Sequence, residues 1–159
     1  MRKKKGFTLI ELLIVIGIIA ILMAIAIVAI NPGRQFAKAN NASRFVAVNT
    51  ILNAVSQNIV DGRGTFDFSA CEGSIPVAST EIADDSAGTD PARYDICDCL
   101  IATYIGAMPV DPTTGSYTSC AAYNTGYNIS QDITTGRVTV SAPSAEDDNG
   151  GAPVISATR

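Results

Sequence analysis

The sequence lacks histidine altogether, so imidazole-based catalysis and histidine-ligated metal sites are excluded. Charge is nearly absent from one long stretch: between Gly6 and Pro32 the one ionisable side chain is Glu11. Four of the eleven Lys and Arg residues lie in residues 1–6, and the remaining chain carries 7 basic and 15 acidic side chains, a balance of −8. A field of that sign does not attract phosphates, so direct binding of nucleic acid is not expected.

This stretch of low charge is a predicted membrane segment. Residues 7–30 are 24 residues long, and a helix of this length crosses the ~30 Å of hydrocarbon in a bilayer. A secretory signal would have a shorter apolar region with a small-x-small cleavage site at its far end, where this chain has Asn31-Pro32-Gly33. The basic residues 2–5 hold the N-terminus in the cytoplasm. An uncut membrane tether is the alternative.

A charged Glu11 carries a free-energy cost in a membrane helix. A carboxylate on a membrane helix costs roughly 2.5–3.5 kcal/mol at mid-bilayer and less near the interface. That cost indicates that Glu11 has a use in a second environment, where an opposite charge pairs with it.

The N-terminal string resembles the bacterial type IV pilin family, including the pseudopilins of type II secretion. The match comprises the basic leader, the glycine, the following Phe and an acidic residue at the fifth position counted from that Phe. These features lie in Lys5-Gly6-Phe7-Thr8-Leu9-Ile10-Glu11-Leu12-Leu13-Ile14-Val15-Ile16. Family-like sequence continues to about Ile59. The resemblance implies that a prepilin peptidase cuts between Gly6 and Phe7 and methylates the new amine of Phe7. In the filament that the family forms, we expect the Phe7 amine of a neighbouring copy to be the partner of Glu11, a pair that would fix the register between subunits.

The fold expected from the residues and from the resemblance is α+β, similar to the pilin ladle: a long N-terminal helix whose second half packs on a small antiparallel sheet. Five segments follow along the chain. They are a leader at 1–6, an apolar helix at 7–30, its amphipathic continuation at 31–60, a globular head at 61–142 and a flexible tail at 143–159.

The helix over residues 7–60 should be interrupted at Pro32 and Gly33, because proline removes a backbone donor and glycine weakens the turn. In its second half, apolar residues recur at spacings of three and four, which predicts one buried stripe: Phe45, Val48, Leu52, Val55 and Ile59. Beyond Asp61-Gly62 we expect a long connection to about Arg93, a short helix over 94–108, and strands at 116–119, 123–130 and 137–142.

The four cysteines, Cys71, Cys97, Cys99 and Cys120, all lie in the part expected outside the cytoplasm. An even count there predicts two disulfides. Cys97 and Cys99 are too close to bridge each other comfortably, so we expect one of them to pair with Cys71 and the other with Cys120. Zinc ligation fits Cys-x-Cys spacing poorly, and free thiols are the remaining alternative.

No cofactor is predicted, and no metal site is assigned. The acidic segments 84–90 and 146–150 offer oxygen ligands of the kind that calcium uses, and type II pseudopilins have a calcium loop near the C-terminus, but neither segment has a fixed ligand spacing. No catalytic constellation is found in residues 60–159. The chain is therefore expected to be structural and not an enzyme.

The expected function is a homo-oligomeric filament subunit, with a platform protein and an assembly ATPase as further partners. The precursor would lie in the cytoplasmic membrane with its N-terminus inside, and the filament at the cell surface or elsewhere outside the cytoplasm. A surface pilus for adhesion, twitching or DNA uptake is favoured over a secretion pseudopilus. A membrane-tethered binding module is the alternative of another class.

Overall fold

The computed structural model describes residues 6–71, 73–85, 88, 90–148 and 150–159. The predicted leader, apart from Gly6, lies outside these residues. The chain divides into two units, Met1–Phe36 and Ala37–Arg159; the second is called the head unit below.

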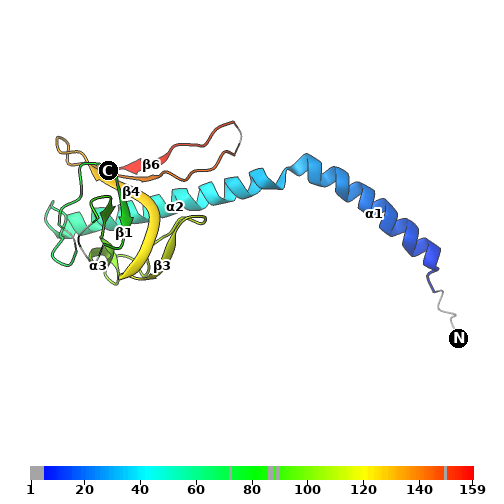
Figure 1. Cartoon of the computed structure of the whole chain (residues 1–159), viewed down its shortest axis with the longest axis horizontal. Helices are drawn as coiled ribbons and strands as arrows, with labels where there is room; N and C mark the ends of the chain where they lie inside the picture. Colours follow the sequence, from blue (N-terminus) through cyan, green and yellow to red (C-terminus); the bar gives the residue numbers. More distant parts are fainter. Residues whose placement is uncertain (1–5, 72, 86–87, 89, 149) are drawn as a thin grey trace. The chain divides into compact units, whose positions relative to one another are not determined.

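The first unit contains the helix α1, Leu9–Ile30 (Figure 1). Thr8, in an extended conformation, is the N-cap of α1. The C-cap is Asn31, whose backbone is left-handed with φ 47°. Pro32 then begins α2, Pro32–Asp61, a position where the missing N–H of proline costs nothing. The predicted single helix over residues 7–60 is therefore two helices, and the interruption is centred on Asn31 rather than on Pro32.

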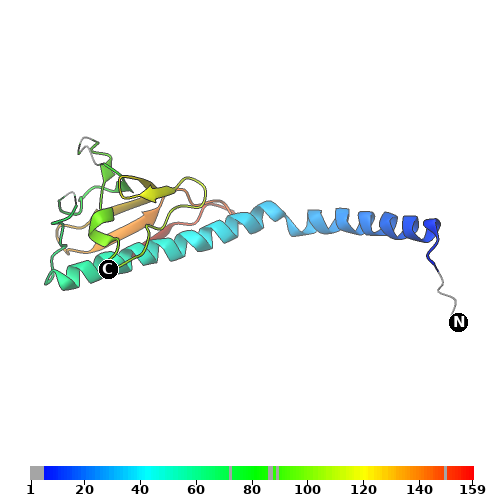
Figure 2. The same cartoon turned by 90° about the horizontal axis from the view of Figure 1, so that it is seen from below.

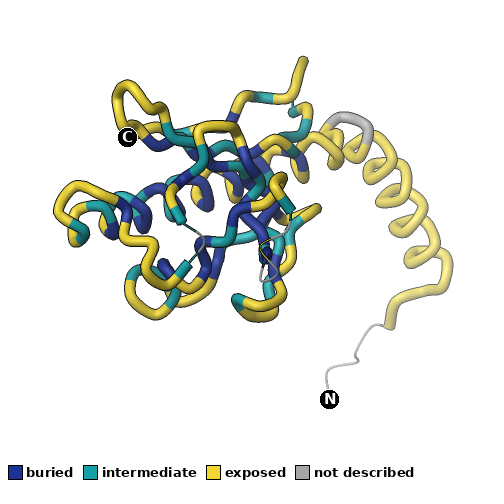
Figure 3. The backbone as a smooth tube through the Cα atoms, turned by 60° about the vertical axis from the view of Figure 1, so that its left-hand side comes forward, coloured by how far each residue is buried: buried dark blue, intermediate teal, exposed yellow. Residues whose placement is uncertain are grey.

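Apart from Glu11 in its first turn, α1 is apolar on all sides. Every residue from Gly6 to Ile27 is exposed (Figure 3). The helix is long and apolar enough over Leu9–Ile27 to cross a membrane. A helix that is apolar all round is stable only when lipid or other protein surrounds it. α1 thus fits a membrane-anchored precursor, as the sequence predicts.

One face of α2 packs against the rest of the head unit, and this face carries both polar and apolar side chains. Val48, Leu52 and Val55 are buried as predicted, but Phe45 is 59% exposed and Ile59 is only partly buried. Including Phe45 in the stripe was wrong, because the buried face is rotated by one residue toward Arg44. The centre of this face recurs at spacings of four and three: Ala37, Asn41, Arg44, Val48, Ile51, Val55 and Asn58. Ala47, Leu52 and Ala54 are also buried.

The sheet lies along one side of this part of α2 (Figure 2). It is built around β4, which pairs antiparallel with β1, β3 and β5, and β5 pairs with β6, while β1 and β2 form a parallel pair. The α+β architecture is confirmed. The strands are β1 Thr80–Ala83, β2 Arg93–Tyr94, β3 Ser116–Ser119, β4 Ala122–Gln131, β5 Val138–Ala142 and β6 Ile155–Thr158.

Three strands were not predicted. β1 and β2 lie in the segment expected to be an irregular connection, and β6 lies in the segment 143–159 expected to be a mobile tail. These strands have four, two and four residues, too few for a periodic pattern to stand out. Their conformation depends on the longer strand beside each: Arg159, for example, exchanges two backbone hydrogen bonds with Val138.

The predicted helix over 94–108 is also wrong in extent, because α3 covers only Cys97–Leu100. Ala102 has a left-handed backbone with φ 68°, which a continuing helix does not allow. The chain turns back so that Ile105 N–H donates to the Leu100 carbonyl at 3.1 Å. The apolar residues that suggested a helix still pack toward the core, but from a turn.

Candidate functional site

The predicted cleavage point lies in an open segment. Gly6 and Phe7 are exposed and non-helical, and they directly precede the N-cap of α1. A Cβ added at Gly6 would have no atom of the described chain within 4 Å. Nothing in the described chain therefore covers the Gly6–Phe7 bond, and a peptidase can reach it in an extended conformation.

Glu11 has partners within its own helix. Its carboxylate accepts hydrogen bonds from the backbone N–H and the hydroxyl of Thr8, each at 2.8 Å, and its own N–H donates to the Thr8 hydroxyl at 3.3 Å. This is a capping box, in which the first and fourth residues satisfy each other's backbone donors. We did not predict it, although Thr8-Leu9-Ile10-Glu11 has the Thr-x-x-Glu pattern that signals one.

In the head unit, Arg44 lies on the buried face of α2 and is itself fully buried. Its guanidinium donates to both oxygens of Asp111, at 2.6 and 3.2 Å, and the side chains of both residues have no exposed surface. A third donor reaches the Thr113 hydroxyl at 2.8 Å. Bidentate pairing of this kind is what permits an arginine to be buried.

Burial alone would raise the pKa of Asp111, but hydrogen bonds from Arg44, Thr113 and Thr114 outweigh it and hold the pKa well below its usual range. The backbone N–H groups of Thr113 and Thr114 donate to one carboxylate oxygen at 2.8 and 3.1 Å. Asp111 is therefore charged at any physiological pH and fixes both the arginine and the turn that follows it.

The turn at 111–115 fits closely against β4. The Asp111 N–H donates to the Thr125 carbonyl at 2.8 Å, and a Cβ at Gly115 would lie 2.5 Å from the Asp111 nitrogen and 2.8 Å from the Thr125 oxygen. Gly126 faces the turn with φ +72°, and a Cβ there would lie 2.8 Å from the Thr114 hydroxyl oxygen. These two glycines let the turn bring Asp111 to Arg44.

Glu146, in the connection between β5 and β6, closes the other side of Arg44. Its carboxylate accepts from Arg44 at 3.3 Å and from the Asn40 amide at 2.8 Å. The Asn41 side chain exchanges two hydrogen bonds with the backbone of Glu146, at 2.7 and 3.0 Å. One turn of α2 thus holds part of the segment 143–159, which the sequence predicts to be a mobile tail.

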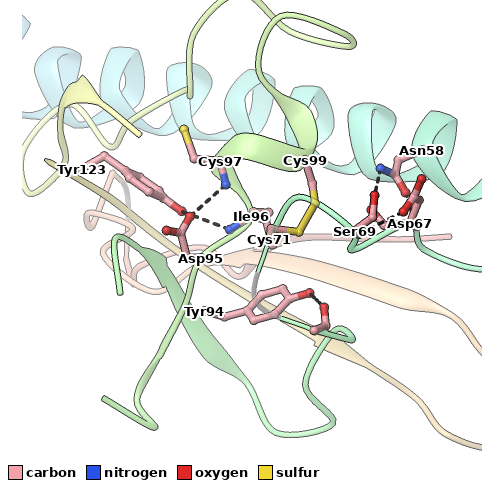
Figure 4. The surroundings of a disulfide bond; sticks show 11 residues. Asn58, Asp67, Ser69, Cys71, Tyr94, Asp95, Ile96, Cys97, Cys99 and Tyr123 are labelled. Carbon is pink, nitrogen blue, oxygen red and sulfur yellow. Dashed lines mark hydrogen bonds between the residues drawn. A yellow bond between two sulfur atoms is a disulfide. The ribbon is translucent and has the colours of Figure 1, made fainter. Parts of the chain in front are cut away.

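The four cysteines form two disulfides, Cys71–Cys99 and Cys97–Cys120. This agrees with the expectation that Cys71 and Cys120 each pair with one member of the Cys97/Cys99 pair. Figure 4 shows Cys71 and Cys99 beside a group of hydrogen bonds in which Asp95 accepts from the Tyr123 hydroxyl at 2.7 Å and from the Cys97 N–H at 3.0 Å. The short helix α3 is therefore linked covalently to two distant loops.

Removing the Cys71–Cys99 disulfide by substituting both residues with alanine is expected to lower the free energy of unfolding by about 2–5 kcal/mol, because its closed loop is released in the unfolded chain. Urea unfolding of the full chain in detergent measures the change. Alkylation without reduction should label none of the four cysteines of the unmodified protein, whereas alkylation after reduction in urea should label all four. Labelling before reduction would contradict the pairing.

The described residues contain no group of three or more His, Cys, Asp or Glu side chains placed to hold a metal ion. The calcium candidates at 84–90 and 146–150 each include positions outside the described residues. Of the acidic side chains that are described, Glu146 binds Asn40 and Arg44, and Asp147 accepts from the N–H groups of Gly150 and Gly151, both at 2.9 Å.

Comparison with known proteins agrees with the N-terminal features. The family model of the prokaryotic N-terminal methylation motif matches residues 1–27. The comparisons with curated proteins and with solved structures give no match. The matched region contains the basic residues, Gly6, Phe7, the Thr8–Glu11 capping box and most of α1. The chain thus carries the N-terminal methylation motif that is the signature of type IV pilins and pseudopilins.

Proposed function

We propose that this chain is the structural subunit of a type IV pilus, inserted in the cytoplasmic membrane as a precursor and polymerised through α1 into a surface filament. The observation that carries the proposal is the combination of the methylation motif at residues 1–27 with a helix whose described side chains from Leu9 to Ile27 are all exposed. Such a surface requires lipid before assembly, and the same segment of neighbouring subunits can replace lipid afterwards.

The motif implies processing by a prepilin peptidase, and we infer cleavage between Gly6 and Phe7 with methylation of the Phe7 amine. Polymerisation would then need a platform protein and an ATPase. Within the family signature, the pilus is favoured over the secretion pseudopilus by the two disulfides, which suit a filament exposed outside the cell. Adhesion, twitching and DNA uptake share this subunit design.

Microscopy of sheared surface fractions, with mass spectrometry of the subunit N-terminus, tests the proposal. We expect filaments whose subunit begins at methylated Phe7. Filaments confined to cells that overproduce a secretion machinery would favour the pseudopilus. Recovery of only the uncut chain from membranes would contradict the proposal and favour a membrane-tethered binding module.

Gly6→Val is expected to leave the leader attached and to abolish filaments. A Cβ at this position would meet no atom of the described chain within 4 Å, so folding of the precursor should not change. The effect would arise in the peptidase, where a glycine allows the closest approach of the backbone. Immunoblotting for the precursor-sized band measures it, with Gly17→Ala as the control, because position 17 is equally open. Mature-length protein from Gly6→Val would show that the cleavage site lies elsewhere.

A further inference from the structure

The outer face of the sheet has an unusual chemistry for an acidic protein. On β5, β6 and the second half of β4, the side chains that alternate away from the core are alcohols or an amide, and none is charged. We call this the hydroxyl face; its members are Asn128, Ser130, Thr139, Ser141, Ser156 and Thr158. Their inward neighbours Ile129, Val138, Val140 and Ile155 are buried.

The strand register aligns these side chains in two straight rows. Asn128 lies opposite Ser141, and Ser141 opposite Ser156, in one row. Ser130, Thr139 and Thr158 form the second row, in which the Thr139 and Thr158 hydroxyls are 2.8 Å apart. Directly opposed side chains in antiparallel strands are about 4.5–5.5 Å apart. The face is therefore a regular array of groups that both donate and accept hydrogen bonds.

A hollow at the β4–β5 turn adjoins the second row. Ser130 and Thr139 of the hydroxyl face line it together with Gln131, Asp132 and Thr134, and two apolar side chains, Val77 and Ile133, complete it. Val77 and Ile133 are 62% and 79% exposed. The hollow thus offers hydroxyl groups, an amide, a carboxylate and apolar surface in one place, the mixture that small polar ligands require.

From these features we propose that the hydroxyl face and its hollow bind a neutral, extended polysaccharide. Sugar hydroxyls match an array of alcohols and amides, and the C–H surfaces of a sugar ring fit against Val77 and Ile133. Asp132 lines the hollow and can accept from a sugar hydroxyl in a charge-assisted hydrogen bond. An anionic polymer is disfavoured, because Asp132 in the hollow and the overall negative charge would repel it. At the β1–β2 end of the first row, Glu81 and Arg93 lie opposite each other and carry opposite charges.

A single face binds weakly. Each hydrogen bond to the ligand replaces one to water, so its net contribution is small. Repetition changes this, because linked faces bind a repeating polymer with an avidity that can exceed the single affinity by 10²–10⁴. The gain rests on the proposed function, since a filament repeats the face along its length, whereas the binding chemistry of the face does not depend on assembly.

The test uses two soluble probes with the same backbone, neutral hydroxyethyl cellulose and anionic carboxymethyl cellulose. Each is applied to sheared filaments and to detergent-extracted subunits coupled densely to beads. We expect binding of the neutral probe on both supports, little change in 1 M salt, and at least tenfold weaker binding of the anionic probe. Binding that salt abolishes, or equal binding of both probes, would overturn the proposal.

Thr139→Glu places a carboxylate at the centre of the second row, and it should weaken binding of hydroxyethyl cellulose at least tenfold. Thr118→Glu is the matched control: Thr118 is an exposed threonine on β3, outside the two rows. Circular dichroism and filament counts confirm that both variants fold and assemble. Unchanged binding by Thr139→Glu, or absence of binding by the unmodified protein on beads, would refute the site. Absence of filaments with binding retained on beads would refute the proposed function alone.

Discussion

Replacing Arg44 by methionine is expected to lower the free energy of unfolding of the head unit by about 3–5 kcal/mol, the cost of leaving one partner of a buried ion pair uncompensated. The side chains of Arg44 and Asp111 have no exposed surface, so water cannot replace the lost partner. Methionine fills much of the arginine volume, so the loss should reflect the unpaired Asp111 carboxylate more than a cavity.

Urea unfolding of the full chain in detergent, followed by circular dichroism, measures this loss. Lys38→Met is the matched control, because Lys38 is an exposed cation on the same helix and its removal should change stability by less than about 0.5 kcal/mol. Glu146→Gln should cost about 1 kcal/mol or less, since 35% of the Glu146 side chain is exposed. Equal stability of Arg44→Met and Lys38→Met would contradict a structural role for the pair.

The same pair predicts how the head unit responds to acid. The pKa of Asp111 is lower in the folded protein than in the unfolded chain, so the unfolded chain binds its proton first as the pH falls. The stabilisation from Asp111 is therefore complete above the ordinary carboxyl pKa of about 3.9 and is lost progressively below it. In Arg44→Met this acid-dependent loss should shrink, because the hydrogen bonds from Arg44 that lower the pKa of Asp111 are gone.

The N-terminal features could be predicted because each is local in the sequence. The basic leader, Gly6 and the apolar run need no distant partner to be identified, and α1 extends over nearly the predicted range. The alternation in β5 was similarly informative, because a half-buried strand shows its two faces directly in the order of its residues.

Arg44 shows why the head network could not be predicted. Arginine is seldom fully buried unless it is paired, and its partner Asp111 lies 67 positions away. The spacing of apolar residues therefore assigned Phe45 to the buried face and left Arg44 out of it. The prediction of a mobile tail around Glu146 was wrong for the same reason. An acidic segment rich in glycine is typical of a mobile tail, and only the structure shows that Asn41 of α2 binds the backbone of Glu146.

Glu11→Gln is expected to abolish filaments while leaving membrane insertion and cleavage intact. The structure makes this substitution more informative than Glu11→Val, because glutamine can still accept the hydrogen bonds of the capping box with Thr8. Only the charge is lost. If the Glu11 carboxylate pairs with the Phe7 amine of a neighbouring subunit, its removal leaves that amine unpaired in an apolar filament core, at a cost of about 3–5 kcal/mol per subunit.

Thr8→Val is the complementary variant. It removes the N-cap hydroxyl but keeps the Glu11 charge, so it should cost α1 only about 1 kcal/mol and should leave filaments nearly normal in number. Filament counts by electron microscopy, in cells where the variant is the only copy, distinguish the two roles. Normal filaments from Glu11→Gln together with few from Thr8→Val would show that Glu11 serves as a helix cap and that another contact fixes the register between subunits.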